Sequence, residues 1–270
     1  MNKKILCFLL PMAMLLAGCE GSNPPDPTNP TIENGALPGK FSVSASTKVQ
    51  FSQGNLQYQT STHTWRFAAH QYDVIGDDNA NISASYSGWI DLFGWGTGNN
   101  PTLLSTDYND YATFTDWGVN AISNGGNKAN QWRTLTNAEW YYLFYTRTNA
   151  ENLCGQATIA GVHGFVFLPD NWTTPNSLTW QGMPNNWTTN QYSVNDWSKM
   201  EAAGAVFLTA AGYRYGTEVH YVGSLGIYWS STPGGDLEDF AYLAYGFYFG
   251  DDNASTGSYR GNGQSVRLVR

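Results

Sequence analysis

The chain has few cysteines, and their positions limit the covalent chemistry that it can use. Its 270 residues contain three, at positions 7, 19 and 154. Cys7 and Cys19 fall in an N-terminal stretch with the features of a targeting segment, so the body of the chain has Cys154 alone. A disulfide within the body and a zinc site built on cysteines are therefore excluded.

Positive charge is also scarce. After residue 19 the chain has 11 basic and 21 acidic residues, a net charge of −10. Proteins that bind nucleic acid need clustered Lys and Arg side chains to neutralise phosphates, and no such cluster occurs here. The charge balance excludes a nucleic-acid partner and predicts repulsion from anionic surfaces.

Sequence signatures of catalysis and metal binding are missing as well. There is no HExxH motif, no glycine-rich phosphate loop and no recognisable nucleophile–base spacing. The four histidines show no ligand-like spacing: His63, His70, His163 and His220. Asp77-Asp78-Asn79 and Asp251-Asp252-Asn253 offer oxygen ligands of the kind calcium prefers, but such runs are more typical of solvated turns. We expect no enzymatic activity, no cofactor and no metal site.

Only one long apolar run is present, and it lies at the N-terminus. Lys3 and Lys4 precede the apolar stretch 5–16, which is too short to span a bilayer. Leu16-Ala17-Gly18-Cys19 follows, and this resembles a bacterial lipobox. The resemblance implies cleavage before Cys19 and lipidation of its thiol; an ordinary signal peptide is the alternative. Glu20 replaces the Asp that signals inner-membrane retention, which favours the outer membrane and permits surface exposure.

The next segment is rich in proline. Residues 20–40 hold five of the eleven prolines and almost no large apolar residue, which predicts a semi-extended tether. Residues 41–270 are enough for one domain with a full core. Aromatic residues make up 15% of the chain and charged residues only 13%, so we expect stabilisation by aromatic packing more than by ion pairs.

Alternating apolar residues predict several strands. Residues 41–58 alternate, and Ser52-Gln53-Gly54-Asn55 supplies a turn signal, so a β-hairpin is expected there. Further strands are predicted at 65–67, 162–169 and 205–210, and in the segment 204–270. Apolar alternation at 49–51 and 266–268 would allow the two ends of the domain to pair.

Two short helices are expected between these strands. Thr136 and Glu139 have the spacing of a capping box, and Trp140, Leu143 and Phe144 then fall on one face. Residues 194–203 form the second candidate helix, which Ser193 and Asp196 cap, with Trp197 and Met200 directed inward. The glycine- and aromatic-rich stretches at 73–98 and 109–118 lack periodicity and are predicted to be long loops, either functional or packed on themselves.

Several motifs, taken in order, resemble a known family. WRTLTNAEW, GFVFLPDNW, AAGYRYG, GIYWSST and GQSVRLVR follow one another from residue 132 to residue 270. This order resembles the Fibrobacter succinogenes major paralogous domain, a group common among Bacteroidetes surface lipoproteins. The group is similar to the C-type-lectin-like superfamily, alongside the formylglycine-generating type of enzyme.

The resemblance implies an α+β, C-type-lectin-like fold with antiparallel sheets, about two helices, long loops and paired terminal strands. The formylglycine-generating activity needs a pair of cysteines near the C-terminus, and none follows Cys154. The calcium-binding triplets of C-type lectins, Glu-Pro-Asn or Gln-Pro-Asp with Trp-Asn-Asp, are absent too. We therefore transfer neither the formylglycine-generating activity nor calcium-dependent sugar binding to this chain.

Residues 236–262 form the predicted ligand-binding segment, because C-type-lectin-like folds place ligands in this part of the chain. Tyrosine gives contact area at low entropic cost, and Ser, Gly and Asn adapt their hydrogen bonds. About half of the residues in 241–249 should instead belong to the core, since a strand buries one face. The candidate residues are Asp236, Asp239, Tyr242, Tyr245, Tyr248, Asp251, Asp252, Asn253, Tyr259 and Arg260. Residues 204–216, 228–232 and 264–270 are assigned to the scaffold.

A sharper hypothesis concerns the origin of this segment. Retroelements that diversify relatives of this fold mutate adenines, and their targets cannot become Lys, Glu, Gln, Trp or Met. Residues 236–262 contain one of these five types, Glu238, although composition predicts about four.

The functional expectation is a lipid-anchored envelope protein that binds an extracellular protein or glycan through this aromatic and acidic surface. A structural or fimbria-associated subunit is the alternative.

Overall fold

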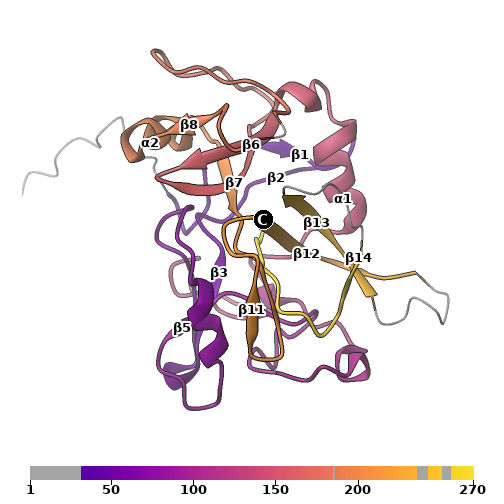
Figure 1. The fold of residues 1–270 in the computed structure, drawn as a ribbon. Helices are drawn as coiled ribbons and strands as arrows, with labels where there is room; N and C mark the ends of the chain where they lie inside the picture. The colour runs from indigo at the N-terminus through magenta and orange to yellow at the C-terminus, as the bar shows by residue number, and fades with distance from the viewer. Residues whose placement is uncertain (1–31, 185, 236–242, 251–256) are drawn as a thin grey trace, which may run out of the picture.

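The computed structural model describes residues 32–184, 186–235, 243–250 and 257–270, which form a mixed α+β fold of small sheets, two α-helices and long connections (Figure 1). The strands are β1 Phe41–Ser42, β2 Lys48–Val49, β3 Leu56–Gln59, β4 Thr64–Phe67, β5 Trp89–Ile90, β6 Cys154–Ile159, β7 Val162–Phe167, β8 Gln191–Tyr192, β9 Val206–Thr209, β10 Tyr213–Tyr215, β11 Glu218–His220, β12 Leu225–Pro233, β13 Leu243–Gly250 and β14 Gly257–Tyr259. The α+β class predicted from the sequence is thereby confirmed.

Two sheets form the upper and central parts of the view in Figure 1. The first has the order β8-β6-β7-β9 and is antiparallel except for the β6–β8 pair. The second has the order β12-β13-β14 and is antiparallel throughout. Two-stranded pairs β1–β2 and β10–β11 and the three-stranded sheet β4-β3-β5 complete the arrangement.

The two ends of the domain pair as predicted. Phe51 bridges Val269 in antiparallel fashion, and the amide nitrogen of Ser52 donates to the carbonyl oxygen of Leu268 over 2.9 Å. The amide of Leu56 donates to Val266 over 2.9 Å in the same way. These bonds close the domain around its last six residues.

The same bonds overturn part of the predicted hairpin over 41–58. The hairpin is β1–β2, with Phe41 opposite Val49, and it turns near Ser44 rather than at 52–55. Residues on both sides of the predicted turn pair with the C-terminal segment instead. Alternation had indicated burial correctly, but it carries no information about which strand is the partner.

The domain also begins earlier than the predicted boundary at Phe41. Ala36 and Leu37 are buried, and the Leu37 amide donates to the carbonyl of Phe51 over 2.9 Å. The end of the predicted proline-rich tether is thus packed against the folded body. Residues 1–31, with the predicted lipidation site Cys19, lie outside the described residues.

Both predicted helices are confirmed. Helix α1, Asn137–Tyr141, begins with the expected capping box: the Glu139 amide donates to the Thr136 hydroxyl, and Glu139 accepts from the Thr136 amide over 2.8 Å. It continues into a π-helical turn, η5, Tyr142–Thr146. Helix α2, Val194–Ala202, begins at Ser193 and buries Trp197 and Met200.

Short 3-10 segments occur in the long connections. They are η1 Thr60–Thr62, η2 Gly76–Asn81, η3 Tyr108–Tyr111, η4 Trp117–Val119 and η6 Ala150–Asn152. The stretches 73–98 and 109–118 are packed on themselves and on the sheets, because Trp95 and Trp117 within them are buried. This is one of the two outcomes predicted for loops of that length.

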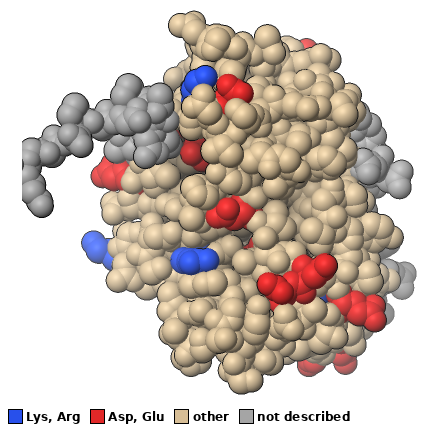
Figure 2. All heavy atoms as spheres, turned by 60° about the vertical axis from the view of Figure 1, so that its left-hand side comes forward, with Lys and Arg blue, Asp and Glu red and all other residues tan. Residues whose placement is uncertain are grey.

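The core is built mainly from aromatic rings. Phe247 of β13 stacks on Trp140 of α1 with ring centroids 5.2 Å apart, and it meets Phe165 and Phe167 of β7 at 5.3 and 5.2 Å. Trp and Phe dominate here because large rings fill the space between short, irregular elements. Charged groups are few and scattered on the face shown in Figure 2, where Lys and Arg form no patch.

Candidate functional site

The structure describes four of the ten predicted ligand-binding residues: Tyr245, Tyr248, Tyr259 and Arg260. The other six lie outside the described residues: Asp236, Asp239, Tyr242, Asp251, Asp252 and Asn253. The four described residues do not converge on one site. They are divided between a groove, a second cavity and the scaffold.

Arg260 has a scaffold position. Its side chain is largely buried, its guanidinium carbon lies 4.5 Å from the ring centroid of Trp95, and its Nε donates to the carbonyl oxygen of Leu243 over 2.9 Å. These contacts join the end of β14 to the start of β13 and to Trp95. The prediction that Arg260 contacts ligand is not supported, because the group that would do so is directed into the protein.

Tyr245 and Tyr248 lie on β13 and are both half-buried. The Tyr245 carbonyl accepts a hydrogen bond from the Ser230 hydroxyl over 2.7 Å. Tyr248 borders a cavity of about 230 Å³ together with Phe144, Met183 and Phe249. Their neighbours Phe247 and Phe249 are core residues, in line with the prediction that part of this strand is buried.

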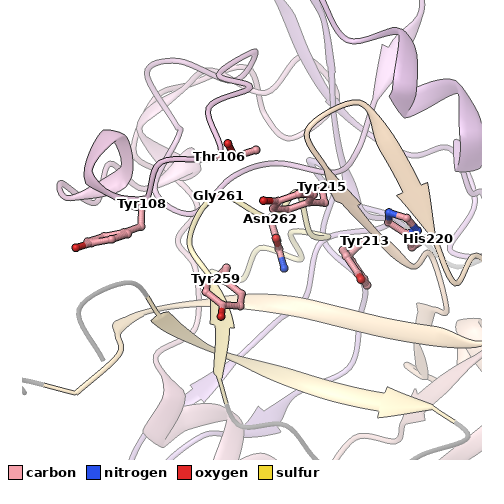
Figure 3. A pocket seen from close by; sticks show the side chains of 8 residues that line it. All are labelled: Thr106, Tyr108, Tyr213, Tyr215, His220, Tyr259, Gly261 and Asn262. Atoms are coloured by element: carbon pink, nitrogen blue, oxygen red, sulfur yellow. The ribbon is translucent and has the colours of Figure 1, made fainter. Parts of the chain in front are cut away.

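Tyr259 borders a groove that is lined by several exposed side chains. This groove has a volume of about 740 Å³ (Figure 3). We call it the tyrosine groove and define it by its lining residues Thr106, Tyr108, Tyr213, Tyr215, His220, Tyr259, Gly261 and Asn262. Three separate stretches of the chain contribute to it, and it is the candidate site.

The β10–β11 hairpin forms one wall. Tyr213 and Tyr215 are two residues apart on β10 and therefore share a face, while Tyr213 lies opposite His220 of β11. Gly216 begins the two-residue turn between the strands with φ of 56°, a conformation that favours glycine. Residues 204–216 had been assigned to the scaffold, so the sequence missed these two tyrosines.

Arg214, between the two tyrosines, points away from the groove and fixes the hairpin. It is fully buried, and its Nη1 donates to the carbonyl oxygen of Gly216 over 2.6 Å. Its backbone exchanges hydrogen bonds of 2.8 and 2.7 Å with Gly263. Burial lowers the pKa of the guanidinium, and none of the described carboxylates forms an ion pair with it. The hairpin is therefore tied to the segment that carries Gly261 and Asn262.

The segment 259–262 forms a second wall, and the loop that leads into η3 forms the third. Asp107 caps this turn by accepting from the Asn109 amide over 2.9 Å. The buried Tyr111 donates its hydroxyl to the carbonyl of Ser105 over 2.8 Å. A Cβ atom on Gly261 would lie 3.1 Å from that same oxygen, so glycine permits the two walls to approach each other. Thr106 and Tyr108 are held beside Tyr259 as a result.

The lining of the tyrosine groove is uncharged but polar. None of its eight residues is Lys, Arg, Asp or Glu, and every side chain in it, apart from that of Gly261, carries a hydrogen-bonding atom. Burial, and then the neighbouring Tyr221, raises the pKa of Tyr213, so its hydroxyl remains a donor at neutral pH. His220 Nε2 lies 3.5 Å from a carboxylate oxygen of the exposed Glu218. The groove can stack rings and exchange hydrogen bonds.

Reactive groups elsewhere are buried and engaged. Burial raises the pKa of the Cys154 thiol to about 12, and the thiol donates to the Ala150 carbonyl over 3.2 Å. Burial likewise raises the pKa of Asp91 to about 6, and its carboxylate accepts from Asn79 Nδ2 over 2.8 Å. Across the described ranges, no three His, Cys, Asp or Glu residues are grouped to hold a metal ion.

No helix in the described part of the chain is long and apolar enough to cross a bilayer. No protein-family model, no curated protein and no solved structure matches this chain. The predicted resemblance to the Fibrobacter succinogenes major paralogous domain therefore remains a prediction, as does the finer assignment to a C-type-lectin-like fold. The tyrosine groove is the feature on which a functional argument can be built.

Proposed function

We propose that this protein is a non-catalytic recognition protein of the cell envelope. It is anchored through a lipid on Cys19, in the outer membrane, and binds an extracellular protein or glycan in the tyrosine groove. The observation that carries the proposal is the groove itself, where three separated parts of the chain place four tyrosines around one hollow. Its volume of about 740 Å³ lies within the range of roughly 300–1,000 Å³ that is typical of ligand sites.

The exposure of these rings supports recognition. Tyr215 and Tyr259 keep more than half of their surface accessible. Burying the apolar surface of these rings would stabilise the folded state, so their exposure has a cost in stability. Tyrosine is enriched in binding sites because it offers large contact area and a hydroxyl while losing little side-chain entropy. Hydrogen bonds of Arg214 and Tyr111 hold two walls of the groove in place, and such bonds reduce the cost of ordering a site upon binding.

A binding screen with a matched control tests the proposal. The full chain in mild detergent would be probed on arrays of glycans and of extracellular proteins, beside Tyr215→Ala/Tyr259→Ala. Tyr141→Ala/Tyr145→Ala serves as the control, because these tyrosines are equally exposed and belong to α1 and η5, outside the groove.

The proposal predicts at least one ligand whose binding is lost in the groove variant and retained in the control. If each ligand of the wild-type chain bound both variants equally well, recognition through the tyrosine groove would be wrong. Thermal unfolding of the three proteins checks that the folded state is maintained, and exposed positions of this kind usually change stability by no more than about 0.5 kcal/mol.

A further inference from the structure

We infer that the ligand of the tyrosine groove is an uncharged saccharide, bound without calcium by stacking on Tyr215 and Tyr259 and by hydrogen bonds to Asn262. The inference rests on the proposed function and narrows its ligand from a protein or glycan to one chemical class. Three properties of the lining carry it: its charge, the kind of apolar surface that it offers, and the placement of its one amide.

Charge excludes ionic ligands first. An acidic ligand would need Lys or Arg, and none of the described lining residues is either; it would also approach a chain of net charge −8. A cationic ligand such as a quaternary ammonium ion would need rings closed around it or a carboxylate. None of the described lining residues carries a carboxylate, and Tyr108, Tyr215 and Tyr259 are too exposed to form a closed cage.

The apolar surface that the described residues give the groove comes mainly from tyrosine rings. None of the described lining residues is Leu, Ile, Val or Met. A pyranose ring has flat faces of C–H groups and an edge of hydroxyls. A tyrosine ring can cover such a face, while the hydroxyl, imidazole and amide groups around it meet the hydroxyl edge.

Asn262 supplies the directional group. Its Oδ1 is buried without a hydrogen-bond partner among the described atoms, and its amide nitrogen points into the space between Tyr259 and Tyr213 (Figure 3). Buried polar atoms are normally paired, so the unpaired Oδ1 indicates that contacts within the described protein do not account for the placement of this side chain. The amide nitrogen that faces the groove can donate to a hydroxyl or ring oxygen of a ligand, while the buried Oδ1 faces the protein.

Inhibition by defined competitors tests the inference. Neutral oligosaccharides, acidic oligosaccharides and random peptides would be titrated against the full chain in EDTA, and again with Asn262→Ala and Asn262→Asp. We expect neutral oligosaccharides to bind and the affinity to fall at least tenfold in both variants. Asn262→Asp preserves the size of the side chain, so a loss in that variant reflects the exchanged donor and the new charge, not a cavity.

The outcomes separate the two proposals. One outcome is that peptides or acidic saccharides bind, that Tyr215→Ala/Tyr259→Ala abolishes this binding, and that neutral saccharides do not bind. That outcome would overturn the inference and leave the proposed function intact. Neutral saccharides that require calcium, or that bind both Asn262 variants as well as the wild type, would also overturn it. Binding that ignores every groove variant would overturn the proposed function together with the inference.

Discussion

Phe247 and Tyr259 lie on neighbouring strands of one sheet, and their side chains have opposite surroundings. Phe247 is enclosed by Trp140, Phe165 and Phe167 at centroid distances of 5.2–5.3 Å. Tyr259 borders an open groove and keeps 58% of its surface accessible. The aromatic core is thus built mainly of Trp and Phe, with a few buried tyrosines such as Tyr228, whereas all the aromatic carbocycles that line the groove belong to Tyr.

The division follows from the hydroxyl group. A ring without polar atoms gains most from complete burial, at roughly 25 cal/mol per Å² of apolar surface. The hydroxyl of tyrosine needs a hydrogen-bond partner, so tyrosine is favoured where one end of the ring packs on the protein and the other contacts solvent. Substitutions in the core should therefore change stability, and substitutions in the groove should change binding.

Removing a ring from the core should have the largest effect. Trp140→Ala should lower the free energy of unfolding by about 3–5 kcal/mol, because it leaves a cavity against Phe247 and removes the indole bond to the Trp229 carbonyl. Urea denaturation measures the change. The exposed neighbour Tyr141→Ala is the control, with an expected change within about 0.5 kcal/mol. Equal effects at the two positions would contradict the division.

A buried carboxylate beside the groove scaffold should make stability depend on pH. Burial raises the pKa of Asp91 from 3.8 to about 6, so the folded state binds this proton more tightly than the unfolded chain. The stability that protonation contributes is present below pH 3.8 and is lost as the pH rises through about 6. The difference amounts to roughly 3 kcal/mol.

Relative to Asp91→Asn, the wild-type chain should therefore lose stability between pH 4 and pH 7. Denaturant midpoints of both proteins across this range measure the difference. The lost acceptor oxygen in the variant contributes an offset that does not change with pH. Parallel curves over the whole range would show that Asp91 does not titrate in this way.

Groove substitutions should show the reverse pattern. Tyr215→Ala should reduce affinity for a groove ligand by about tenfold or more, corresponding to about 1.4 kcal/mol of binding free energy, while stability changes by no more than about 0.5 kcal/mol. Calorimetric titration and thermal unfolding of the same preparation measure both quantities. If Tyr215→Ala lowered the free energy of unfolding as much as Trp140→Ala, Tyr215 would contribute to stability in the same way as a core ring, contrary to the proposed difference between core and groove.

Chelation should have the smallest effect. The described residues group no three His, Cys, Asp or Glu side chains around a common centre, and none of those that line the tyrosine groove carries a carboxylate. Excess EDTA is therefore expected to leave both the melting temperature and the affinity for a groove ligand unchanged. If EDTA lowered the melting temperature or the affinity and added calcium restored it, the protein would have to contain a cation site.

The sequence predicted local structure better than it predicted the site. The capping box at Thr136 and Glu139 and the pairing of the chain ends depend on short patterns, and both were correct. The hairpin over 41–58 was wrong because Phe51 and Leu56 find partners more than 200 residues away. Alternation specifies which face is buried, whereas the partner strand is a property of the whole fold.

The tyrosine groove could be predicted only in part. Tyr259 belonged to the predicted segment, but Tyr213 and Tyr215 come from a hairpin and Tyr108 from a loop far away in the chain. The alternation of Tyr213, Arg214 and Tyr215 did place both tyrosines on one face, a signal that could have identified that wall. Nothing local indicates that Arg214 joins this wall to Gly263.

Oxidative footprinting of tyrosines shows whether a bound ligand covers the tyrosine groove. The full chain would be oxidised with and without a saturating neutral oligosaccharide that it binds, and modification would be measured residue by residue. We expect oxidation of Tyr215 and Tyr259 to fall severalfold, while that of the similarly exposed Tyr141 and Tyr145 does not change. Protection of Tyr141 and Tyr145 with the groove tyrosines unaffected would contradict this expectation.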